Sequence, residues 1–72
     1  MQNLKLRIRN GDNGRFRLGG FSRADGTTTI SRLKKKEAID LVFSESMTAT
    51  QRSRAKIYLS ETLPQTKVNF LN

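Results

Sequence analysis

The chain of 72 residues contains neither cysteine nor histidine. Without cysteine it forms no disulfide and offers no thiolate to a metal ion. A domain this short therefore depends on efficient packing or on a partner subunit for its stability. A homodimer is therefore one expected arrangement. The same two absences remove the commonest general base and the thiol nucleophile of enzymes. We expect a binding protein rather than an enzyme, with no metal ion and no other cofactor.

Long apolar runs are also missing. No stretch approaches the roughly 20 apolar residues that a membrane-spanning helix needs, and the N-terminus lacks the apolar core of a signal peptide. The absence of cysteine is compatible with a reducing compartment. We expect a soluble protein of the cytoplasm that does not associate with membranes.

Acidic side chains are scarce: six stand against 14 lysines and arginines, which gives a net charge of +8 at pH 7. Residues 1–36 carry ten basic and two acidic side chains, whereas residues 37–72 carry four of each. Because like charges concentrated in one segment repel each other, such a segment is typical of proteins that bind a polyanion. The distribution favours nucleic acid as the partner, with an acidic protein surface as the alternative.

The most regular pattern lies in residues 4–18, where apolar residues alternate with basic ones on both sides of a Gly-Asp-Asn-Gly turn. A period of two predicts two strands, each apolar on one face and basic on the other. A three-residue loop over 12–14, with Gly14 in the left-handed conformation, places Ile8 opposite Leu18. A two-residue turn would instead place an arginine opposite an apolar residue. The pattern therefore predicts a hairpin with a three-residue loop.

The basic side of this hairpin is the predicted binding face. Lysines and arginines on a twisted sheet can follow a phosphate backbone and release its counterions, and arginine can also contact guanine in a major groove. Phe21 is expected on the same side, where it could stack on a base. The expected nucleic-acid-binding residues are Lys5, Arg7, Arg9, Arg15, Arg17, Phe21, Arg23, Lys34, Lys35 and Lys36.

A second turn of the same type is predicted at 24–26, where Ala-Asp-Gly precedes three threonines. Threonine and isoleucine favour a strand over 27–31. A three-residue loop in this second hairpin would place Ile30 opposite Gly20. The three strands together would form an antiparallel meander.

The next element is predicted to be a helix that covers the apolar face of the meander. It would begin near the lysines at 34–36 and continue through 38–43, whose apolar residues form a wide arc at helical spacing. Glu37 in the first turn suits the helix dipole, whereas the three lysines oppose it. That local cost favours a binding role for the lysines, although a solvated helix start would also accommodate them.

The C-terminal third permits two interpretations. Thr48 and Gln51 have capping-box spacing, which predicts a helix over 48–61. The alternation of apolar and polar residues over 54–59 would also suit a strand. Alternation over 66–71 predicts an edge strand. A second, weaker basic group on this segment comprises Arg52, Arg54 and Lys56.

Together these patterns predict a single α+β domain over residues 1–72. It would consist of a three-stranded antiparallel meander covered by one helix, with a C-terminal helix or hairpin completing the core. Its expected function is to bind nucleic acid, DNA more than RNA, through the phosphate backbone. The alternative is a small inhibitor of viral or plasmid type that binds an acidic surface of a host protein.

Overall fold

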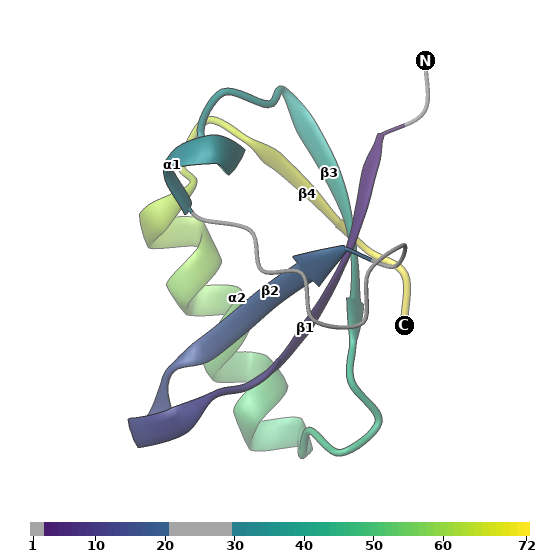
Figure 1. Cartoon of the computed structure of the whole chain (residues 1–72), viewed down its shortest axis with the longest axis vertical. Coiled ribbons are helices and arrows are strands. Elements are labelled where there is room, and N and C mark those ends of the chain that lie inside the picture. The colour runs from purple at the N-terminus through teal and green to yellow at the C-terminus, as the bar shows by residue number, and fades with distance from the viewer. Residues whose placement is uncertain (1–2, 21–29) are drawn as a thin grey trace.

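The structure, a computed structural model, describes residues 3–20 and 30–72. Helix α2 lies across one face of a four-stranded sheet, with β1 and β2 crossing in front of it in the view of Figure 1. The elements in chain order are β1 (Leu4–Asn10), η1 (Asp12–Gly14), β2 (Phe16–Gly20), α1 (Ile30–Leu33), β3 (Ala38–Phe43), α2 (Ala49–Thr62) and β4 (Lys67–Phe70).

The sheet is mixed, with the strand order β2-β1-β3-β4. Strands β1 and β2 are antiparallel, whereas β3 is parallel to both β1 and β4. The α+β class is therefore confirmed, but the three-stranded antiparallel meander is wrong. Parallel neighbours need a crossover connection, and α2 provides it between β3 and β4.

The first hairpin has the predicted register. Ile8 lies opposite Leu18, and Arg9 lies opposite Arg17. The loop is the short 3-10 turn η1, in which Gly14 has a φ of 72°. Residues that carry a Cβ rarely adopt this left-handed backbone conformation, so a glycine at this position closes the turn without strain.

The segment 38–43 forms strand β3, so the helix predicted over it is wrong. Ile39, Leu41 and Phe43 have exposed fractions of 0%, 0% and 1%, and the residues between them are half-buried. A six-residue run that is almost entirely apolar fits a helical arc and a buried strand equally well. The strand prevails because both of its edges find partners, β1 and β4.

The strand predicted over 27–31 is also wrong where the structure describes it. Ile30 begins helix α1 and therefore does not face Gly20, which pairs with Leu6. The turn predicted at 24–26, together with the predicted binding residues Phe21 and Arg23, lies outside the described residues.

Helix α2 confirms the helical interpretation of the C-terminal third. The backbone N–H of Gln51 donates to Thr48 Oγ1 at 3.2 Å, and the backbone N–H of Thr48 donates to Gln51 Oε1 at 2.8 Å. Asn10 Nδ2 also donates to Gln51 Oε1, at 3.0 Å, which ties the start of the helix to the end of β1. Within the described ranges, no helix is both long enough and apolar enough to cross a lipid bilayer.

Replacing Thr48 with alanine is expected to lower the free energy of unfolding by about 1 kcal/mol, because the hydroxyl that accepts from Gln51 is lost. Urea denaturation followed by circular dichroism measures the change. Thr48→Ser keeps the hydroxyl and should stay within a few tenths of a kcal/mol of the parent protein. Equal losses in the two variants would contradict the capping role.

The core lies between α2 and one face of the sheet. Helix α2 contributes the buried residues Ala55 and Leu59. Two aromatic pairs also pack there: Phe43 stacks on Phe70 with 5.4 Å between the ring centroids, and Phe16 packs against Tyr58 with 5.6 Å between the ring centroids. The buried apolar residues are Leu6, Ile8, Leu18, Leu33, Ile39, Leu41, Phe43, Met47, Ala55, Leu59 and Leu63.

Candidate nucleic-acid interface

Five basic side chains lie on the face of the β1–β2 hairpin that points away from α2. They alternate along the strands with Leu6, Ile8 and Leu18, which are buried beneath the helix, so the pleat turns them to the opposite side. All five are exposed. This basic face comprises Lys5, Arg7, Arg9, Arg15 and Arg17.

The register brings two of these charges together. Arg9 lies directly opposite Arg17, whereas Arg7 lies directly opposite Gly19. A Cβ on Gly11 would lie 3.0 Å from the Arg17 Cγ and from the Arg15 carbonyl oxygen. The aliphatic part of Arg17 therefore occupies the space that the glycine leaves open.

Asp40 marks the border of the basic face. It is the β3 neighbour of Lys5, and its Oδ1 accepts hydrogen bonds from the side-chain amides of Asn3 and Asn69, at 3.2 Å and 3.1 Å. Strands β3 and β4 place Ala38, Asp40, Val42, Lys67 and Asn69 on this side of the sheet, and Lys67 is the one cation among these five. The positive charge is concentrated on β1 and β2.

A hollow of about 400 Å³ adjoins the basic face where β3 ends. Arg7 and Glu45 both line it. The Glu45 carboxylate would repel a phosphate there, so the hollow lies outside the path expected for a phosphate backbone. The other lining residues are Val42, Phe43, Ser44 and Asn72.

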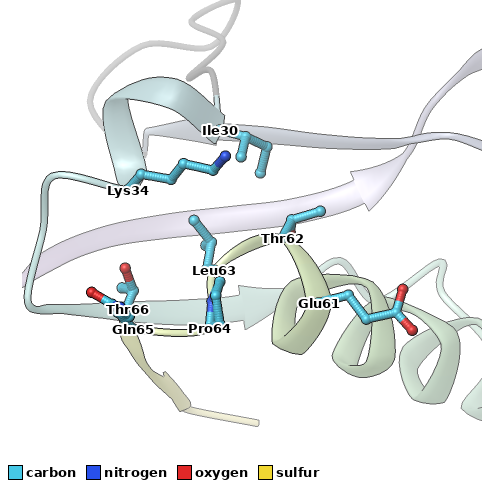
Figure 2. A pocket seen from close by; sticks show the side chains of 8 residues that line it. All are labelled: Ile30, Lys34, Glu61, Thr62, Leu63, Pro64, Gln65 and Thr66. Atoms are coloured by element: carbon cyan, nitrogen blue, oxygen red, sulfur yellow. The ribbon is translucent and has the colours of Figure 1, made fainter.

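The three lysines predicted to extend the basic face lie in the connection after α1, not in the first turn of a helix. Figure 2 shows Lys34 across from Thr62 and Leu63, at a groove of about 490 Å³ between α1 and the end of α2. Because α2 covers the other side of the sheet, Lys34 is separated from the basic face. Lys35 and Lys36 line a different hollow beside α1, together with Ser31 and Arg32.

The weaker basic group on α2 does not form one surface. Arg52 Nε donates to the Met47 carbonyl oxygen at 3.2 Å, and its guanidinium lies 5.5 Å from the centroid of the Phe43 ring. Lys56 Nζ lies 5.2 Å from the centroid of the Phe70 ring. Arg54 lies about 200° around the helix axis from both, on the exposed side.

Comparison of the chain with known protein families, curated proteins and solved structures finds no match. Function must therefore be inferred from the chemistry of the described side chains. Among these, the basic face brings five like charges together on two adjacent strands. Sequence periodicity alone was sufficient to identify them, because each alternates with a core residue.

Proposed function

We propose that the protein binds nucleic acid and that the basic face contacts the phosphate backbone. The observation that carries the proposal is the pairing of Arg9 with Arg17 on an exposed face that also carries three further cations. Like charges opposite each other in a ladder cost stability, and a bound polyanion removes that cost.

The spacing of the charges suits a phosphate backbone. Alternate residues of a strand are about 6.6 Å apart, so Lys5, Arg7 and Arg9 span about 13 Å. One strand of a DNA duplex carries a phosphate about every 3.4 Å along the axis, and about four phosphates therefore fall within that span. Arg17 of β2 and Arg15, which directly precedes that strand, add a second row beside β1.

The shape of the hairpin favours duplex DNA over RNA. An antiparallel ribbon of two strands fits the major groove of B-form DNA, which is about 12 Å wide. The major groove of A-form RNA is too narrow and deep for side chains to read. In the DNA groove, the guanidinium groups of Arg7, Arg9 and Arg17 could also contact the O6 and N7 atoms of guanine.

Fluorescence anisotropy of labelled duplex DNA, single-stranded DNA and duplex RNA tests the proposal across about 50 to 200 mM salt. If the five cations each neutralise one phosphate, the logarithm of the association constant should fall with the logarithm of salt with a slope of about −4 to −5 on duplex DNA. The slope should be shallower on single strands.

Weak, salt-independent binding to every probe would contradict the proposal. The basic face would then be better explained as the contact surface of an inhibitor for an acidic protein. Such an inhibitor should depend more on an apolar anchor than on salt.

A further inference from the structure

Strand β4 is an edge strand that, among the described residues, pairs only with β3. The backbone N–H of Lys67 donates to the Glu37 carbonyl oxygen, and that of Leu71 donates to the Leu41 carbonyl oxygen, both at 2.8 Å. Alternate residues of a strand direct their backbone groups to opposite sides. Val68 and Phe70 therefore direct their N–H and C=O groups away from the sheet.

A groove of about 260 Å³ runs between this edge and α2. Val68 and Phe70 lie opposite Ile39 and Leu41 of β3, so their side chains turn toward the helix and form one wall of the groove. The groove thus places apolar side chains directly beside backbone groups that pair with no other strand of the described ranges 3–20 and 30–72. The other lining residues are Lys56, Leu59, Ser60, Leu63, Pro64 and Thr66.

The charge of this edge indicates what can occupy it. Lys56 lies in the groove and Lys67 is exposed on the strand, and no carboxylate among the described residues lines the groove. A second copy of the chain would bring the same two lysines against this edge and add its own net charge of +8. Lysines at an edge strand are a known device against self-association. The charge is complementary to an acidic strand from a different protein.

We propose that the edge of β4 binds an extended acidic segment of another protein by strand addition. The segment pairs its backbone with the N–H and C=O groups of Val68 and Phe70. Its apolar side chains enter the groove against Leu59 and Leu63, and an acidic side chain lies near Lys56. Strand β3 separates this edge from β1, so the site is distinct from the basic face (Figure 1).

A capped octapeptide serves as the probe, with valine at positions 1, 3 and 7 and glutamate at the other five positions. Three valines and one glutamate then face the groove with Lys56, and the remaining glutamates face away from α2. Titrated into ¹⁵N-labelled protein, it should cause saturable amide shift changes at Val68 and Phe70 and along the C-terminal half of α2. A matched peptide, N-methylated on the residues that would face β4, lacks the required N–H donors and should leave these shifts unchanged. Shift changes confined to Arg7 and Arg17, or none at all, would overturn the proposal.

Lys56→Met and Arg54→Met provide a matched pair, because each removes one positive charge from α2 and keeps an unbranched side chain. Lys56→Met should weaken peptide binding about three- to fivefold, whereas Arg54→Met, on the exposed side of the helix, should change it less than about twofold. If the two variants weaken peptide binding equally, the effect is one of net charge, and the proposed binding of the peptide in the groove is contradicted. Circular dichroism establishes that both variants are folded.

The outcome is separable from that of the proposed function. Lys56→Met should bind duplex DNA as tightly as Arg54→Met does, because both residues lie away from the basic face. A protein that binds DNA but not the peptide refutes strand addition alone, and one that binds the peptide but not DNA refutes the basic-face proposal alone.

Discussion

Replacing Leu41 with alanine is expected to lower the free energy of unfolding by about 2–5 kcal/mol. Leu41 is 0% exposed, and it lies in β3 between Leu6 of β1 and Phe70 of β4. A cavity at this position has neighbouring strands on both sides and α2 above it, so little can move to fill it. A domain of this size has a total stability of about 4–11 kcal/mol, and much of it would be lost. Urea denaturation measures the difference.

Val42→Ala is the matched control, because Val42 is the next residue on the same strand but lies half-buried on the opposite face. Val42→Ala should lower the free energy of unfolding by about 1 kcal/mol. The comparison also tests the assignment of β3, since a helix over 38–43 would place Val42 at the centre of its apolar arc. If Val42→Ala lowers the free energy of unfolding more than Leu41→Ala does, the assignment of residues 38–43 to a strand is contradicted.

The double variant R9Q/R17Q is expected to bind duplex DNA about 10- to 60-fold more weakly near 0.1 M salt. Each phosphate contact releases about 0.9 counterion on binding. The loss of two contacts should therefore make the slope of the logarithm of the association constant against the logarithm of salt shallower by about 2. Glutamine is shorter than arginine but polar and uncharged, and both residues lie on the exposed face, so the fold should survive. Anisotropy titrations across a salt series measure both quantities.

The matched control is K34Q/R54Q, which removes the same number of positive charges from sites away from the basic face. Its affinity should stay within a few-fold of the parent protein, because long-range attraction is screened beyond about 10 Å at this salt. If K34Q/R54Q loses as much affinity as R9Q/R17Q, the basic face is not the contact surface.

The same R9Q/R17Q variant should unfold at a higher temperature than the parent protein. Arg9 and Arg17 face each other across the ladder, and removing two like charges in this position relieves about 0.2–1 kcal/mol of repulsion. For a domain of this length, that corresponds to an increase in Tm of about 1–8 °C. A variant that is more stable and yet binds more weakly would separate a binding role for these arginines from a structural one.

Local features of the sequence were sufficient to predict those elements that are stabilised by interactions between residues close together in the chain. The hairpin register follows from the alternation on both sides of residues 12–14 and from the left-handed conformation that Gly14 supplies. The start of α2 follows from the spacing of Thr48 and Gln51, whose hydrogen bonds close within one turn. The basic face follows directly from the hairpin, because the pleat separates its apolar and charged side chains.

The tertiary structure decided the elements whose partners lie far away in the chain. Residues 38–43 are apolar enough for a helix or a strand, and only pairing with β1 and β4 makes the strand the state that satisfies its backbone. That pairing places α2, rather than the segment that precedes it, over the core, and it positions Lys34 beside α2 rather than on the basic face. The alternation over residues 66–71 predicted an edge strand, and β4 confirms it. The groove between β4 and α2 depends on the packing of the helix and could not be predicted from that alternation.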